Sequence, residues 1–180
     1  LLVVVLLLVA GLSVVGTGSV AAQQSADLVV ATDGSGDYSS IQNAVDNASN
    51  TARIEIKSGV YEESATIDKN VTIAAPDGAT LTPSPSGSDF SGISITEHAA
   101  PHISGLDIDG FDVSINAGRA GATDPTNGDW KVTNISINGN NEQYSSGIDA
   151  SETSGNWTLK SIKIKNTDYG ISFSSSTSDI

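Results

Sequence analysis

The chain of 180 residues contains no cysteine and no methionine. Without cysteine there is no disulfide framework and no thiolate metal site, so the fold must be held together by packing and backbone hydrogen bonds. Basic residues are also scarce: 8 Lys and Arg stand against 21 Asp and Glu, and the formal net charge is −13. A surface of this charge repels nucleic acid and anionic lipid, which makes both poor partners.

The excess of Asp, the shortage of Lys and an aromatic content of only 5% are typical of proteins from halophilic archaea. A strongly acidic surface keeps a protein soluble when concentrated salt screens its self-repulsion. An ordinary acidic secreted protein would have a similar composition, so both origins stay open.

Charge is missing altogether from the first 26 residues. Residues 1–10 are continuously apolar, and glycine then interrupts the run before Val20-Ala21-Ala22, whose small side chains suit a signal peptidase. The run is too short and too interrupted for a stable membrane span. We therefore expect residues 1–26 to be a signal peptide whose basic start lies upstream, which predicts a secreted or cell-surface protein. An uncleaved N-terminal hydrophobic anchor is the alternative.

A single helix is predicted early in the remaining sequence. Residues 33–37, Asp-Gly-Ser-Gly-Asp, form a turn cluster. Ser39 and, three residues later, Gln42 match a capping box, which marks a helix start. The helix is expected from about Ser40 to Ala48, because four apolar residues fall on one helical stripe: Ile41, Ala44, Val45 and Ala48.

From Arg53 onward the hydrophobic period changes to two, which predicts short strands of three to five residues separated by turn residues. The alternating apolar pairs are Ile54 and Ile56, Ala65 and Ile67, Val71 and Ile73, Ala79 and Leu81, and Ile93 and Ile95. No second helical pattern follows Asn50. A doubly wound α/β fold is excluded, because it needs helices between its parallel strands.

A repeat decides the architecture. Residues 104–110, SGLDIDG, align with residues 133–139 and again with residues 160–166, at offsets of 29 and 27 residues. A Gly-Ile element at 92, 147 and 170 repeats with them. One such unit cannot bury its apolar side alone, whereas stacked units bury it as a continuous column. An antiparallel sandwich would explain the Asn-Gly turns at 127–128 and 138–139, but not the recurrent unit.

Residues 30–64 resemble the N-terminal segment of pectinesterases and, more widely, the right-handed parallel β-helix proteins of the pectin-lyase-like superfamily. The matching pieces are Val30-Ala31, Asp33 to Asp37, Ile41-Gln42, Ala44-Val45, Lys57, Gly59-Val60-Tyr61 and Glu62-Glu63. The resemblance implies an all-β fold: a single-stranded right-handed parallel β-helix whose short N-terminal α-helix plugs the open end. The implied domain covers residues 27–180, with a cap at 27–64 and rungs at 65–180, and is expected to stop in mid-solenoid.

The resemblance implies a fold more strongly than an activity. Pectinesterases use two Asp residues, an Arg and oxyanion-stabilising Gln residues on later rungs, and these motifs have no match here. The catalytic residues are therefore unknown. If the protein is an enzyme, the resemblance implies a polysaccharide esterase, lyase or hydrolase.

Three carboxylates form the one acidic cluster that suggests chemistry. Asp107 and Asp109 lie two apart on a predicted strand and project from one face, and Asp112 follows closely. Such a set can perform acid–base hydrolysis or bind Ca²⁺. The alternative is a solvated face, because the aligned positions in the next repeats carry any polar residue: Ser136 and Asn138, then Lys163 and Lys165. No cofactor is required, and Ca²⁺ is the one ion that the cluster suggests.

Two other groups of residues are possible binding elements. His98 and His102 are the only histidines, and Pro101 between them favours loop residues over a metal site. Trp130 and Trp157 are expected to stack on adjacent rungs, either exposed as a platform for sugar rings or buried as an internal stack. Tyr144 and Tyr169 precede matching Gly-Ile elements and leave the same two interpretations open.

Four N-x-S/T sequons would accept glycans on an exported protein, unless the asparagines are turn residues. They begin at Asn47, Asn70, Asn134 and Asn156.

The preferred hypothesis is an exported β-helix protein that binds or processes polysaccharide at the cell surface. One alternative is a non-catalytic structural or adhesive surface module. Another is a pectinesterase-like carbohydrate esterase whose catalytic residues lie beyond Ile180. In each case the expected partner is a polysaccharide or cell-surface glycan, and contact with a membrane is expected only through the N-terminal segment or a C-terminal anchor.

Overall fold

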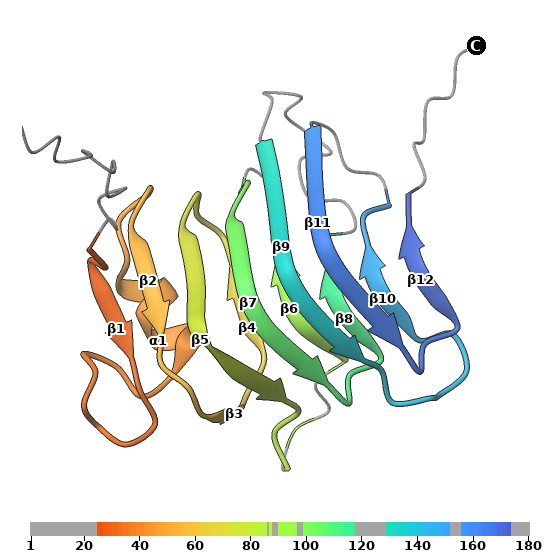
Figure 1. The fold of residues 1–180 in the computed structure, drawn as a ribbon, viewed down its shortest axis with the longest axis horizontal. Helices are drawn as coiled ribbons and strands as arrows, with labels where there is room; N and C mark the ends of the chain where they lie inside the picture. The colour runs from red at the N-terminus through yellow and green to blue at the C-terminus, as the bar shows by residue number, and fades with distance from the viewer. Residues whose placement is uncertain are drawn as a thin grey trace, which may run out of the picture.

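The computed structural model describes residues 25–85, 87, 90–96, 99–117, 129–151 and 156–173. These residues form a parallel β-solenoid of about five turns, with 54% strand and 5% helix. Figure 1 shows the long strands descending in front and the short strands rising behind them as the chain advances, so that the coil is right-handed. The predicted all-β solenoid with one short helix is confirmed.

Two parallel sheets form the walls of the solenoid. One sheet has the order β1-β2-β5-β7-β9-β11, with β3 also paired to β5, and the other has the order β12-β10-β8-β6-β4. Each later turn therefore contributes one long strand to the first sheet and one short strand to the second. The elements are β1 (Leu28–Val30), α1 (Ile41–Asn47), β2 (Arg53–Ile56), β3 (Val60–Glu62), β4 (Ala65–Ile67), β5 (Thr72–Thr82), β6 (Ser91–Ile95), β7 (His102–Asp109), β8 (Val113–Asn116), β9 (Asp129–Asn138), β10 (Ser146–Asp149), β11 (Asn156–Lys165) and β12 (Tyr169–Ser172).

The predicted repeat matches the register of the long strands. Ser104 of β7 lies opposite Thr133 of β9, which lies opposite Lys160 of β11. The Gly-Ile elements at 147 and 170 are also neighbours, in β10 and β12. The element at 92 does not pair directly with the one at 147, because β8 lies between them. The sequence repeat missed this turn.

The long strands are longer than the predicted three to five residues, because each bends round a corner and continues. The corner residue has a left-handed backbone in each of the four longest strands: φ is +76° at Gly78, +80° at Gly105, +53° at Asn134 and +56° at Ser161. The strand registers place these four residues in one row. A left-handed residue redirects the chain without leaving the sheet, and Gly and Asn adopt this conformation most readily.

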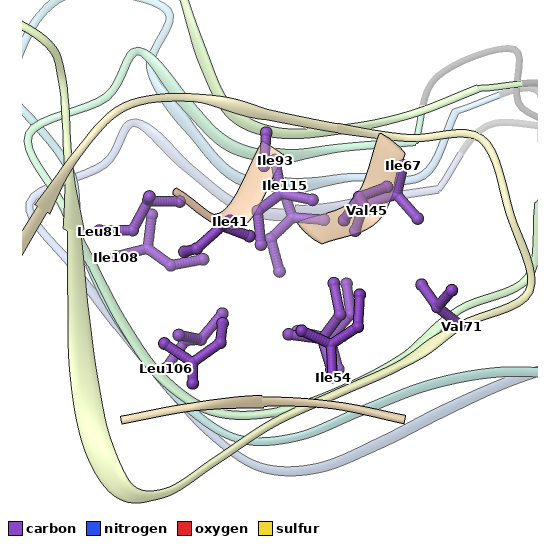
Figure 2. Packing of buried hydrophobic residues seen from close by; sticks show 14 of the residues in the cluster. Ile41, Val45, Ile54, Ile67, Val71, Leu81, Ile93, Leu106, Ile108 and Ile115 are labelled. Carbon is purple, nitrogen blue, oxygen red and sulfur yellow. The ribbon is translucent and has the colours of Figure 1, made fainter. Parts of the chain in front are cut away.

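The interior is filled by columns of aliphatic side chains that run along the solenoid axis. In one column Ile54 pairs with Ile73, Ile73 with Ile103 and Ile103 with Val132, and each is at most 1% exposed. Figure 2 shows further side chains from both walls pointing into the shared interior. Full burial of one such side chain is worth roughly 1.5–3 kcal/mol, so these columns provide the main stabilising free energy.

Helix α1 closes the N-terminal end of this interior, as predicted. Its buried residues Ile41 and Val45 face the ends of the columns. Residues of the first turn bind both ends of the helix. At its start, Glu63 accepts hydrogen bonds from the backbone N–H groups of Ile41 and Gln42. At its end, the Lys69 ammonium donates to the carbonyl of Val45. A carboxylate near the N-terminus of a helix and a cation near its C-terminus both interact favourably with the helix dipole.

The predicted capping box is wrong. The N-cap is Ser40, one residue later than expected, and its hydroxyl accepts a hydrogen bond from the Asn43 N–H. Gln42 has a different role. Its side-chain amide accepts from the backbone N–H of Thr66 and donates to the backbone carbonyl of Thr66, which lies in the edge strand β4. Gln42 thus occupies the hydrogen-bonding groups that a further strand would use.

A row of small residues lies where the short strands pack against the long ones. The registers align Gly92, Ser114 and Gly147. An added Cβ at Gly92 would lie 2.9 Å from the Phe111 ring, and one at Gly147 would lie 2.8 Å from the Ile164 side chain. Ser114 is fully buried in this row, and its hydroxyl has no hydrogen-bond partner. An unsatisfied buried hydroxyl destabilises a fold.

Alanine substitutions at two corner glycines distinguish the free-energy cost of a left-handed backbone from the cost of overpacking. Gly105→Ala should lower the free energy of unfolding by about 3 kcal/mol or more, because it places alanine in a left-handed conformation and also overpacks the corner. The new Cβ would lie 2.2 Å from the carbonyl oxygen of Ala75. Gly78→Ala has nothing within 4 Å of its Cβ, so it should lose only the backbone term of about 1–2 kcal/mol. Urea unfolding of the two variants checks this, and equal losses would contradict it.

A second prediction uses two buried serines. Ser114→Ala should raise the free energy of unfolding by about 1 kcal/mol, because it removes an unsatisfied hydroxyl. Ser145→Ala is the control, since Ser145 is equally buried but its hydroxyl accepts a hydrogen bond from the Asp168 N–H. That variant should instead lose about 1 kcal/mol. Chemical denaturation of both proteins gives the signs, and a loss of stability in Ser114→Ala refutes the prediction.

Candidate functional site

A polar cleft of about 340 Å³ lies along the first sheet, where four neighbouring strands begin. The strands are β2, β5, β7 and β9, so the cleft crosses consecutive turns and runs along the solenoid axis. It is lined by Thr51, Asn70, Val71, Thr72, Ala100, His102 and Asp129. The residues that define it thus come from segments nearly 80 positions apart in the chain, which the parallel register brings together.

The lining offers several kinds of hydrogen-bonding group. The hydroxyls of Thr51 and Thr72 can donate and accept, the Asp129 carboxylate accepts, and the His102 imidazole does either according to its tautomer. His102 is exposed and begins strand β7 in register with Thr72, so it is not the loop residue that the sequence predicted. The side-chain oxygen of Asn70 accepts from the Ala100 N–H and fixes the wall. Such a lining suits a polyhydroxylated ligand. The other predicted histidine, His98, lies outside the described residues.

Asp107 and Asp109 lie on the outer face of β7, as their spacing predicted, but their surroundings differ from those of an open carboxylate pair. Asp109 accepts a hydrogen bond of 2.5 Å from the Asn138 amide, and Asn138 accepts one of 2.7 Å from Asn166. Asp112 accepts a hydrogen bond from Asn140 on the next turn. Two of the three carboxylates therefore link successive turns.

These carboxylates do not gather at one point. Within the part of the chain that the structure describes, no group of three His, Cys, Asp or Glu side chains lies close enough to hold a metal ion. Asp107, Asp109 and Asp112 are all among the residues searched. A catalytic or Ca²⁺-binding role for them stays a prediction.

Trp130 and Trp157 stack on adjacent turns, as the repeat predicted. Their ring centroids lie 4.7 Å apart and their planes differ by 8°. Trp130 is only 3% exposed and belongs to the core, while Trp157 is partly buried and contacts the Phe173 ring edge-on. Because so little of Trp130 reaches solvent, this geometry fits an internal stack better than a sugar platform.

Tyr144 and Tyr169 lie at the corner where the last two described turns enter their short strands, β10 and β12. They are 70% and 53% exposed. The segments are adjacent, since the Tyr144 N–H donates to the Asp168 carboxylate and the Tyr169 N–H donates to the Ser145 carbonyl. The structure thus places two exposed aromatic rings on neighbouring turns, and a role for them in sugar binding stays a prediction.

The four sequon asparagines are all exposed. The side-chain amide of Asn47 donates to the Asn43 carbonyl and that of Asn156 to Asp129. Asn134 occupies the left-handed corner of β9. Exposure is what glycosylation requires, and the modification itself stays a prediction.

Comparison of the sequence with models of known protein families, with curated proteins and with solved structures finds no match. Among the described residues, no helix has the length and apolar character needed to cross a membrane. The function of the cleft and of the exposed tyrosines is therefore inferred from their own geometry.

The two tryptophans give a direct test of the internal stack. Trp157→Phe leaves Trp130 as the only tryptophan, and its fluorescence should be blue-shifted and weakly quenched by acrylamide, because the ring is buried. Trp130→Phe leaves Trp157, which should be quenched more strongly. Strong quenching of Trp130 in the first variant, with the circular dichroism of the fold unchanged, would favour the exposed platform instead.

Proposed function

We propose that this protein is an exported β-solenoid that binds polysaccharide at the cell surface. The observation that carries the proposal is the polar cleft, which crosses four adjacent strands in the direction of the solenoid axis. An extended glycan is a long chain with hydroxyl groups at every sugar, so a linear cleft can contact several sugars at once. Export is proposed from the uncharged apolar residues 1–26.

The lining of the cleft supports a sugar ligand. Its hydroxyl, amide, imidazole and carboxylate groups are those that fix a polar ligand in orientation, and the partly buried Ala100 adds apolar surface. Adjacent parallel strands are about 4.8 Å apart, so polar side chains on successive strands, such as the registered pair Thr72 and His102, follow one another along the cleft at about that interval. A repeating polymer matches such a row better than a compact small molecule does.

The finer proposal is that the solenoid is of the pectin-lyase-like type. It is supported by the resemblance of residues 30–64 to pectinesterases, by the helix that plugs the N-terminal end and by the right-handed coil. We propose no catalytic step, because the resemblance brings no catalytic motif with it.

The alternative function is a structural or adhesive module without a ligand in the cleft. One observation favours it: the carboxylates of Asp109, Asp112 and Asp168 are each engaged by a hydrogen-bond donor of an adjacent turn. Such hydrogen bonds stabilise the stacking of adjacent turns and do not require a ligand. The two functions differ in whether the cleft residues affect binding.

A matched pair of double variants tests the cleft. Thr72→Ala with His102→Ala removes two groups that lie opposite each other in the cleft, while Thr80→Ala with Asp107→Ala changes a registered pair on the same two strands beyond the corner. Affinity gel electrophoresis in a neutral β-glucan and in an acidic polyuronate measures the retardation. Losing two hydrogen bonds of about 0.5–1.5 kcal/mol each should weaken binding roughly tenfold in the first variant only.

The wild-type protein provides the decisive control. Absence of retardation by every polysaccharide would refute the proposed function and favour the structural module. Equal weakening by both double variants would move the binding site away from the cleft.

A further inference from the structure

The lysines in the first turns all have partners inside the structure. Lys57 forms an ion pair with Glu55 at 2.6 Å, and this hydrogen-bonded carboxylate raises the pKa of Lys57. Lys69 donates to the carbonyls of Val45 and Asp46 at the end of α1. In a chain with 21 acidic and only 8 basic residues, such pairing is the expected state of a lysine.

Three lysines of β11 differ from these. Lys160, Lys163 and Lys165 are all exposed on the outer face of the strand, and within the described residues none of them takes part in an ion pair. We call these three residues the lysine strip. Their register neighbours on β9 are uncharged: Thr133, Ser136 and Asn138. The strip therefore carries three positive charges beside a neutral surface.

The lysines of the strip lie close enough to repel one another. Lys163 and Lys165 project from the same face of the strand about 7 Å apart, so their charges repel each other. Lys131, exposed on β9, adds a fourth cation close to Lys160. Asp129 lies two residues from Lys131 on the same strand and accepts a hydrogen bond from the Asn156 amide. An anionic ligand would relieve this repulsion.

Charge also changes along the axis on this face. From β7 onward, one outer row runs from Asp107 through Ser136 to Lys163, and another runs from Asp109 through Asn138 to Lys165. The same register positions thus pass from negative through neutral to positive within three turns. In these two rows the positive charge lies on β11.

We propose that the lysine strip binds the carboxylate or sulfate groups of an anionic polysaccharide. The choice of a sugar polymer rests on the proposed function and on the exposed ring of Tyr169, four residues beyond Lys165, with Tyr144 on the neighbouring turn. Lysine ammonium groups contact the anionic groups, and the tyrosine rings offer flat faces to the sugars. Duplex DNA is another polyanion that exposed lysines could attract, and the test below includes it.

A charge-removing and a charge-preserving triple variant test the proposal. K160Q/K163Q/K165Q should bind alginate and dextran sulfate about tenfold more weakly than the wild type in calorimetric titrations at low salt, because exposed charge pairs each contribute up to about 1 kcal/mol. K160R/K163R/K165R should bind both polymers as the wild type does. The affinity of the wild type should fall as salt is added, and that of the Gln variant should change less. Comparing the two polymers distinguishes carboxylate from sulfate groups.

The single variant Lys57→Gln removes one charge far from the strip and should leave these affinities unchanged. Unchanged affinity in the Gln variant, or equal binding of neutral dextran by the wild type, would overturn the proposal. So would tighter binding of duplex DNA than of either polymer. Self-association of the Gln variant without loss of affinity would assign the strip to protection of the strand edge instead. Because the cleft variants are tested on a neutral β-glucan as well as on a polyuronate, failure of the strip alone leaves binding of the neutral glucan, and with it the proposed function, intact. Loss of binding to every polysaccharide would instead refute both proposals.

Discussion

Each turn of this protein depends on the parallel register that it shares with the next turn. Inward side chains such as Ile73 and Ile103 lie directly above one another, so one turn covers the apolar surface of its neighbour. A single turn buries too little surface to be stable alone, whereas stacked turns form one continuous column. The same register sets the outer rows, and through them the cleft, the tryptophan stack and the lysine strip.

The fold was predictable from the sequence wherever the turns are regular. The three aligned units beginning at Ser104, Thr133 and Lys160 match the structural register. The turn at β5 escaped the repeat, because its register with β7 shifts between Ala74 and Ala79, where β5 has extra residues. The turn at β8 escaped because Ser114 stands where the neighbouring turns have glycine. Both departures are local, and neither interrupts the columns of the core.

The site was less predictable, for a physical reason. The cleft is formed by residues that begin successive strands. The local sequence around Thr51 and around Asp129 does not indicate that both residues line the same cleft. Spacing along one strand did predict the shared face of Asp107 and Asp109. It could not predict that Asn138 and Asn140 would engage Asp109 and Asp112 from the next turn. The lysines of β11 were visible in the sequence, but their lack of acidic neighbours appears only once the register is known.

The Gln42 amide has a consequence for how such a column can be extended. At the N-terminal end it occupies the backbone N–H and carbonyl of Thr66 in the edge strand β4. At the edge strand β1, the Val29 N–H donates to the Asp37 carboxylate, the Val29 carbonyl accepts from the backbone N–H groups of Asp37 and Tyr38, and the Ala31 N–H donates to the Tyr38 carbonyl. Neither sheet therefore offers a template for strand addition at this end. In the sense used for filaments, the N-terminal end of this column is a blocked end, so a designed fusion, graft or capping strand cannot extend either sheet there.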